Sequence, residues 1–233
     1  MRPHRSAALL VALASAAGAG CRHAAAPPAP LPADWRSLAH DPAPFAALYR
    51  LAVGGQRNLI LTVRGGAGRL ALTVAVPPGG AALAVWVAGD EGWVERVKER
   101  CREPLPRGTI PLPGDASLPL DAHLAALLLS GLVPAVAREA PGAPGWVAAG
   151  VGDLEWRARI EGTPAVCTRA AVMDASGRTV FEADLSSPVG SVPGGLVVAA
   201  GSQRAEMTLQ EWHVAEPPGP PAWLSLPPCG VAP

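Results

Sequence analysis

The sequence predicts an α+β protein in which about eleven antiparallel strands form one large sheet around one principal helix. Short apolar runs with a period of two recur along the chain and are separated by turns rich in Gly and Pro. Only one stretch combines Leu and Ala at the spacing of a helix. The chain has 233 residues, a length that fits one domain with a real core or at most two small ones.

The first half of the domain predicts a meander of hairpins. A helical candidate opens at Trp35 and is broken by Pro42 and Pro44, and the period becomes two from Leu48 onward. Leu and Val alternate with more polar residues, as a strand with one buried face requires, and the GGAG and PPGG segments supply turns. The expected strands lie at residues 48–53, 57–64, 69–76, 82–89 and 93–100.

The helix is predicted in the middle of the domain. Residues 104–119 contain five prolines and are expected to be irregular. The helix then runs from Asp121, a plausible N-cap, to Gly131, and its leucines recur at the spacing of one apolar face. Residues 138–150 are expected to form a Gly/Pro-rich loop. The remaining strands are expected at 154–161, 165–173, 178–185, 194–200, 204–214 and 222–226.

The first residues predict an export signal. Arg2 and Arg5 precede an apolar run of about a dozen residues, which is shorter than the roughly 20 that a spanning helix needs. The GAGC segment that ends at Cys21 resembles a bacterial lipobox. Residues 1–20 are then a lipoprotein signal peptide, and acyl chains on Cys21 anchor the protein to a membrane. The alternative is an ordinary cleaved signal followed by an incidental Cys.

The residues after Cys21 predict where the domain is held. In enteric bacteria, an Asp directly after the lipidated Cys retains a lipoprotein in the inner membrane, and this chain has Arg22 at that position. By that resemblance, the expected location is the bacterial outer membrane, with the domain facing the periplasm. Residues 21–34 are rich in Ala and Pro without periodicity and predict an extended spacer. The folded domain is expected to cover residues 35–233.

The cysteines predict one disulfide in an oxidising compartment. With Cys21 set aside, Cys101, Cys167 and Cys229 remain, and three pairings are possible. We favour Cys101 with Cys229, because each follows an expected strand in a Pro-flanked stretch, whereas Cys167 lies inside an apolar strand as a small buried side chain does. The sequence has no C-x-x-C motif and no cluster of histidines, so neither a metal nor another cofactor is expected.

Composition and motifs argue against two functional classes. The chain carries 19 basic and 19 acidic side chains, and Lys98 is its only lysine, so no nucleic-acid partner is expected. The G-x-S-x-G, P-loop and H-E-x-x-H motifs do not occur in the sequence. His123 is expected to be a partly exposed helix residue and not a base. We therefore expect that the protein is not an enzyme.

Three segments resemble a known family. Residues 69–94, 118–134 and 207–230 are similar, in order and spacing, to the strand–turn–strand centre, the leucine-rich helix and the final strands of the periplasmic lipoprotein carriers that include LolA and LolB. The resemblance implies a half-open barrel of about eleven strands with a helix lid and an apolar cavity that accepts acyl chains. Lipidation at Cys21 favours the anchored, LolB-like receptors over the soluble shuttle, so this chain is identified as a divergent member.

The resemblance also implies which residues face the membrane and the ligand. The turn formed by Pro77, Pro78, Gly79 and Gly80 matches a loop from which some outer-membrane members project a Leu toward the bilayer, and this chain has Pro78 at that position. Apolar side chains of the sheet and the helix are expected to line the cavity. They are Leu59, Leu61, Val63, Leu70, Leu72, Val74, Trp156, Leu124, Leu127 and Leu128. The alternative is that these side chains pack a closed core.

Two functions fit these observations. The first is a monomeric outer-membrane lipoprotein that binds a lipid or an acylated protein and acts in lipoprotein localisation as LolB does. The second is a structural or interaction lipoprotein that uses the same fold as a scaffold for a cell-envelope complex.

Overall fold

The computed structural model describes residues 29–89, 91–105, 108–112, 116–118, 120–189 and 192–230. The expected signal peptide at 1–20, the expected lipidation site Cys21 and the first part of the expected spacer lie outside the described residues. Within the described ranges, no helix combines the length and the apolar character that a membrane crossing needs.

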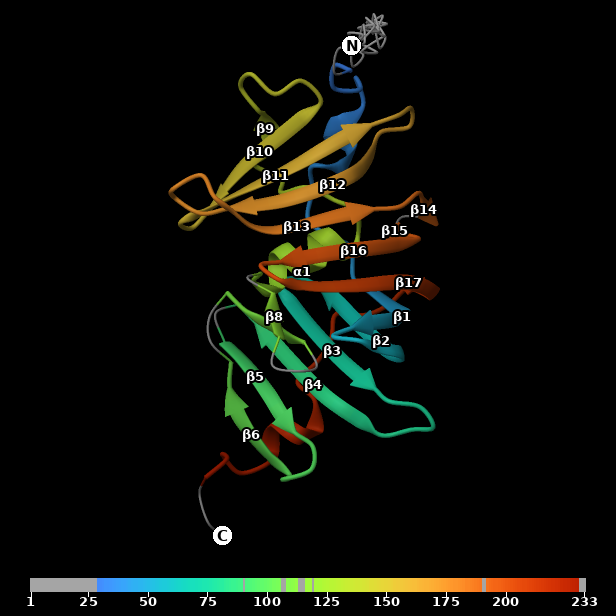
Figure 1. The fold of residues 1–233 in the computed structure, drawn as a ribbon, viewed down its shortest axis with the longest axis vertical. Helices are drawn as coiled ribbons and strands as arrows, with labels where there is room; N and C mark the ends of the chain where they lie inside the picture. Colours follow the sequence, from blue (N-terminus) through green and yellow to red (C-terminus); the bar gives the residue numbers. More distant parts are fainter. Residues whose placement is uncertain are drawn as a thin grey trace, which may run out of the picture.

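Six strands form the first half of the main sheet (Figure 1). In the second of them Leu59, Leu61 and Val63 are buried, whereas Thr62 and Arg64 are exposed, so the period of two in the sequence sets the face that each side chain takes. The strands are β1 (Phe45–Val53), β2 (Gln56–Gly66), β3 (Arg69–Ala75), β4 (Ala81–Ala88), β5 (Glu91–Arg96) and β6 (Cys101–Pro104).

The second half of the main sheet contains seven strands, and two short hairpins lie outside the sheet. The strands are β9 (Arg138–Glu139), β10 (Trp146–Val151), β11 (Leu154–Glu161), β12 (Val166–Met173), β13 (Thr179–Leu185), β16 (Gly195–Ala200) and β17 (Gln203–Val214). The hairpins are β7 (Ile110–Leu112) with β8 (Ala116–Leu118), and β14 (Pro188–Val189) with β15 (Val192–Pro193).

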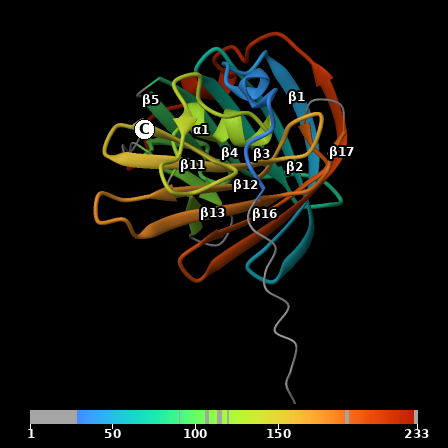
Figure 2. The same ribbon diagram turned by 90° about the horizontal axis from the view of Figure 1, so that it is seen from above.

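All strands of the main sheet pair antiparallel, in the order β6-β5-β4-β3-β2-β1-β17-β16-β13-β12-β11-β10-β9. The pairing of β1 with β17 joins the N-terminal meander to the last long strand of the chain. The two end strands, β6 and β9, do not pair with each other, so the sheet is curved but open (Figure 2). The predicted fold class, one large antiparallel sheet with a helix, is confirmed, with thirteen strands in place of about eleven.

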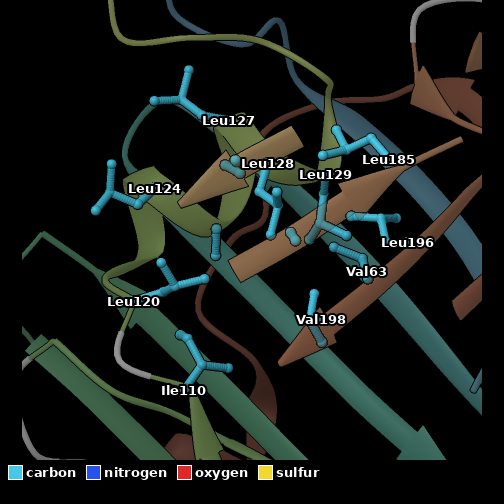
Figure 3. Packing of buried hydrophobic residues seen from close by; sticks show 14 of the residues in the cluster. Val63, Ile110, Leu120, Leu124, Leu127, Leu128, Leu129, Leu185, Leu196 and Val198 are labelled. Carbon is cyan, nitrogen blue, oxygen red and sulfur yellow. The ribbon is translucent and has the colours of Figure 1, made fainter. Parts of the chain in front are cut away.

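The single α-helix of the described residues, α1 (Ala122–Leu129), is almost entirely buried. The Asp121 side chain accepts a hydrogen bond from the Leu124 N–H at 2.7 Å and caps the first turn. Seven of the eight helical residues are buried, His123 being the exception. Figure 3 shows Leu129 of α1 near Val63 of β2 and Leu196 of β16, one from each half of the sheet. The helix covers the inner face of the open sheet, as the predicted lid does, but it is apolar on nearly all sides and not amphipathic.

Two local predictions are wrong. The expected loop at 138–150 contains β9 and β10, because Val147 and Ala149 are buried by pairing with β11 although the small residues around them give no polar alternation. The expected strand at 222–226 is a 3-10 helix, η2 (Ala222–Ser225). Proline residues flank η2 on both sides and lack the N–H that a strand ladder needs.

Five further strands, β6, β7, β8, β14 and β15, lie in segments where we expected no strand. The segment expected to be irregular, 104–119, holds the β7–β8 hairpin, and β6 comes directly before it. The helical candidate at the start of the domain is limited to a 3-10 turn, η1 (Trp35–Leu38), whose Trp35 is buried. The end of the expected spacer contacts the domain, since the Asp34 carboxylate accepts a hydrogen bond from the Ala165 N–H at 3.1 Å.

A disulfide joins Cys101 of β6 to Cys229, the pairing that we favoured. It fastens the C-terminal tail to the edge of the sheet. The Arg102 N–H donates to the Pro227 carbonyl at 3.0 Å, and the Cys229 N–H donates to the Arg102 carbonyl at 2.9 Å. The Arg102 guanidinium also lies 4.1 Å from the centre of the Trp93 ring. The tail thus covers part of the backbone edge that β6 would otherwise expose.

Candidate functional site

All ten side chains predicted to line an acyl cavity are buried and belong to one hydrophobic cluster. The structure divides them into two groups. A small cavity between α1 and the sheet is lined by Leu61, Leu70, Leu72, Val74 and Leu128. The other five, which line none of the cavities described below, are Leu59, Val63, Trp156, Leu124 and Leu127.

The cavity between α1 and the sheet is narrow. It has a volume of about 40 Å³ and an almost entirely apolar wall, to which Ile110, Leu120 and Met207 also contribute. One water molecule takes about 30 Å³ of the liquid, so the space is far below the roughly 300 Å³ at which ligand pockets begin. In this structure the chain's own side chains fill most of the interior, and the remaining space is too small for an acyl chain.

A larger hollow of about 370 Å³ lies at the C-terminal end of α1. Its wall is mainly apolar and comes from four separate parts of the chain: the segment around η1 and the start of β1, the residues after α1, the start of β12, and the β14–β15 hairpin with the end of β17. Leu132, Val166 and Val192 are among the side chains that line it. This space falls within the size range of ligand pockets.

Phe45 lies between this hollow and the helix. Its side chain lines the hollow and is only 2% exposed. A Cβ atom added at Gly65 would lie 2.8 Å from the Phe45 ring and 3.5 Å from the Cβ of Ala126 in α1. The ring therefore packs directly on the glycine backbone of β2, beside α1. The hollow and the narrow cavity lie at the same helix, the first at residues 130–132 and the second at Leu128 and Leu129.

Four buried hydrogen-bond donors have no partner among the described residues. They are the Tyr49 hydroxyl and the Nε1 atoms of Trp86, Trp156 and Trp212, of which Trp212 lines the hollow. Burial raises the pKa of Tyr49 well above its usual range, so its phenol stays protonated. Donors in an apolar interior can bind the carbonyl oxygen of an acyl ester, because an unpartnered buried polar group is costly.

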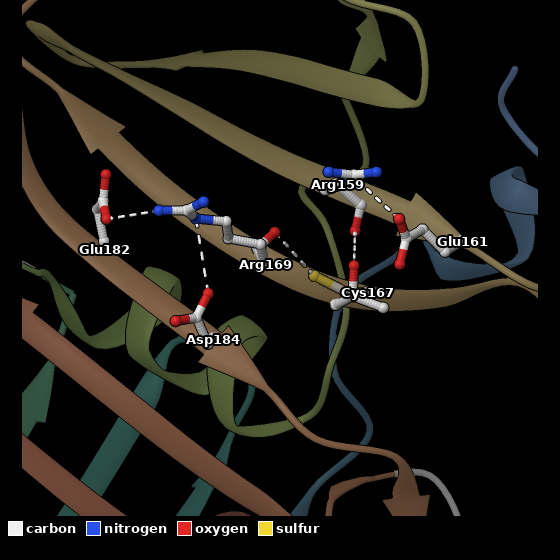
Figure 4. A network of polar contacts seen from close by, with 7 residues as sticks. Arg159, Glu161, Cys167, Arg169, Glu182 and Asp184 are labelled. Atoms are coloured by element: carbon white, nitrogen blue, oxygen red, sulfur yellow. Dashed lines mark hydrogen bonds and ion pairs between the residues drawn. The ribbon is translucent and has the colours of Figure 1, made fainter. Parts of the chain in front are cut away.

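Cys167 also lines the hollow but is not a reactive thiol. It is buried, and burial raises its pKa to about 12, so it is not a thiolate at neutral pH. Its Sγ donates a weak hydrogen bond to the Arg169 carbonyl at 3.5 Å (Figure 4). On the same strand, Arg169 pairs with Glu182 at 2.7 Å and with Asp184 at 3.6 Å, so these charges hold neighbouring strands together.

The turn expected to face the membrane is exposed. The connection from β3 to β4 contains Pro77, Pro78, Gly79 and Gly80, and all four residues are exposed to solvent. The Val76 N–H donates to the Gly80 carbonyl at 3.2 Å and closes the turn. Val76, which is 45% exposed, is the apolar side chain at its base.

The chain is similar in fold to three solved bacterial structures with which it shares little sequence. A candidate outer membrane lipoprotein-sorting domain from Vibrio parahaemolyticus has 7% identity and a TM-score of 0.47, covering 77% of this chain and 88% of that one. A LolA superfamily protein from Nitrosomonas europaea has 10% identity and a TM-score of 0.46, covering 79% of this chain and 92% of that one. A DUF1329 family protein from Desulfovibrio piger has 10% identity and a TM-score of 0.49, covering 77% of this chain and 88% of that one. No family model and no curated protein matches the chain.

The cap of α1 gives a first prediction. Asp121→Ala should lower the free energy of unfolding by about 1 kcal/mol, because the Leu124 N–H loses its acceptor at a buried helix end. Asp121→Asn keeps a capping oxygen and should cost much less. Urea unfolding followed by circular dichroism measures both variants. Equal losses for Ala and Asn would show that the side-chain hydrogen bond does not stabilise the helix.

Proposed function

We propose that the protein binds acyl chains of a lipid or an acylated protein and carries them at the cell envelope. The observation that supports this most strongly is the 370 Å³ apolar hollow beside α1, at the end of an open sheet whose inner face is apolar. The acyl chain enters at the hollow, passes Phe45 and extends along α1 as the helix shifts away from β2 and β3. Apolar burial supplies the affinity, at about 25 cal/mol per Å².

The finer part of the proposal concerns location. Cys21 carries the lipid anchor, the outer membrane holds it, and the domain faces the periplasm as a LolB-like receptor. A Cys21→Ser change should release the protein from the membrane fraction into the soluble periplasmic fraction. Mass spectrometry of the wild-type N-terminal peptide should show acyl chains on Cys21. A peptide that starts elsewhere, or that lacks acyl chains, would contradict the anchor.

A scaffold that takes no ligand is the second candidate. The narrowness of the 40 Å³ interior cavity favours it, because a solid core needs no cargo to be stable. Native mass spectrometry of the full chain from a bacterial periplasm separates the two functions. Co-purified acyl species, or uptake of a fluorescent fatty acid, would support the carrier. A clean protein mass together with no fatty-acid uptake would support the scaffold.

A substitution at the hollow tests the entry route. Ala43 is exposed and lines the hollow, so Ala43→Trp should fill part of it without disturbing the core. We expect fatty-acid affinity to fall about tenfold, the equivalent of about 1.4 kcal/mol. The measurement is displacement of a fluorescent fatty acid. Ala175→Trp, in the exposed turn before β13, adds the same side chain away from the hollow and should leave uptake unchanged. Equal affinities for the two variants would exclude this entry route.

A further inference from the structure

We infer a second ligand site, a hollow on the outer face of the sheet that binds a phosphate group. Its volume is about 480 Å³, and it lies beside the turn between β1 and β2. Three arginines from three strands line it: Arg50 of β1, Arg57 of β2 and Arg204 of β17. The site goes beyond the proposed acyl binding, because it uses the opposite face of the same strands.

Side chains alternate between the two faces of each strand, and this alternation places the site outside the core. In β1 the odd-numbered residues Tyr49 and Leu51 are fully buried, whereas Arg50 is exposed on the other face. In β17 Ala205 is buried, and Arg204 is exposed. The outer hollow and the apolar interior therefore lie on opposite faces of β1 and β17. Among the residues that line the outer hollow, only Val53, beside the turn, is a buried core side chain.

A β-bulge directs Arg57 into the hollow. Ala52 of β1 is skipped in the register between the two strands, and Arg57 and Asn58 of β2 lie at this irregularity. Asn58 has a φ of 63°, a left-handed conformation that Asn tolerates better than most residues. Strict alternation from the buried Leu59 would turn Arg57 toward the core, yet Arg57 is exposed and lines the hollow. Bulges often re-aim a side chain in this way beside functional sites.

The charges in the hollow are not balanced. Arg204 pairs with Glu206 at 3.2 Å. Across the described part of the chain, neither Arg50 nor Arg57 has an ion pair or a side-chain hydrogen bond. Arginine stays protonated at any physiological pH, so the hollow holds two uncompensated positive charges. Their mutual repulsion is relieved when an anion binds between them.

The chemistry favours phosphate over a carboxylate. A phosphate group offers more acceptor oxygens and more charge than a carboxylate, and the planar guanidinium donates to it through two parallel N–H groups. The Thr208 hydroxyl and the backbone at Gly54 and Gly55 also line the hollow and provide further donors. Inorganic phosphate and a phospholipid head group both present this chemistry.

The experiment uses the full chain with Cys21→Ser, so that no lipid anchor interferes. Inorganic phosphate is titrated by calorimetry, and vesicles of phosphatidylcholine with and without phosphatidylglycerol are tested by flotation. We expect phosphate binding, and a loss of about tenfold or more for the Arg50→Gln/Arg57→Gln double variant. The matched control is Arg64→Gln/Arg178→Gln, which removes the same charge from exposed positions outside the hollow. It should bind phosphate as the parent chain does.

The outcomes separate the sources of the phosphate. Displacement from phosphatidylglycerol vesicles by added phosphate assigns the site to a lipid head group, whereas phosphate binding without vesicle binding assigns it to the free ion. Absence of phosphate binding, or equal losses in both double variants, would overturn the inference. Fatty-acid uptake by the Arg50→Gln/Arg57→Gln variant should be unchanged, so failure of this site is distinguishable from failure of acyl binding.

Discussion

Replacing Trp156 with Ala is expected to lower the free energy of unfolding by about 3–5 kcal/mol. Trp156 is 0% exposed and is among the largest fully buried side chains. Its register partners are Ala149 of β10 and Val172 of β12, which are too small to fill the space that the indole would leave. The Trp156 Nε1 has no hydrogen-bond partner within the described ranges, so the loss comes from packing alone. Urea unfolding followed by circular dichroism measures it.

Trp156→Phe is the matched control, because it keeps an aromatic ring in the same position and removes less volume. Its loss should be clearly smaller than that of Trp156→Ala. A loss below about 1 kcal/mol for Trp156→Ala, the size of an ordinary substitution, would contradict a tightly packed interior around this residue. It would favour a larger empty space there, and with it an acyl site deeper than the hollow beside α1.

Removing the disulfide is the second large change. The Cys101→Ser/Cys229→Ser double variant should lose about 2–5 kcal/mol of stability. The disulfide closes a long loop and so lowers the conformational entropy of the unfolded chain, and without it the unfolded chain regains that entropy. The two cysteines are 128 residues apart in sequence. The contacts of the tail with Arg102 should loosen as well, since their strand, β6, is at the end of the sheet. Chemical unfolding and hydrogen exchange of residues 222–230 measure the two effects.

The control for this prediction is Cys167→Ala. Cys167 is buried and unpaired by any disulfide in the described residues, so its loss should be about 1 kcal/mol, as for a small core truncation. Wild type treated with a reductant should match the double variant. If the reductant leaves the unfolding midpoint unchanged, the disulfide does not constrain the unfolded chain.

Local sequence patterns predicted most of the sheet. The alternation at Leu59, Leu61 and Val63 determines which face of β2 is buried, and the run that contains Trp156 does the same for β11. Both depend only on the geometry of an extended chain, in which neighbouring side chains point to opposite faces. Where alternation is weak, as in β10 with its Ala and Gly residues, the sequence predicted a loop, since pairing with β11 is not visible locally.

The candidate sites were less predictable. The predicted lining residues are all in the core, but their shared burial does not tell whether they enclose a space, and the structure leaves only about 40 Å³ between α1 and the sheet. The hollow beside α1 was not predicted, because its wall combines segments around residues 40, 131, 166 and 188 that only the fold brings together. Arg57 was missed for a related reason, since its direction depends on a bulge between two strands.

The sequence by itself determined which side chains of each strand are apolar, where the helix begins and ends, and which cysteines were the favoured pair, because turns, caps and alternation act over a few neighbouring residues. Only the tertiary structure decided that the helix is a buried core element, that the hollow lies at its C-terminal end, and that unpaired arginines meet on the outer face. These properties depend on packing between segments far apart in the chain, and the free energy of such packing is set by shape and by long-range contacts that no local pattern contains.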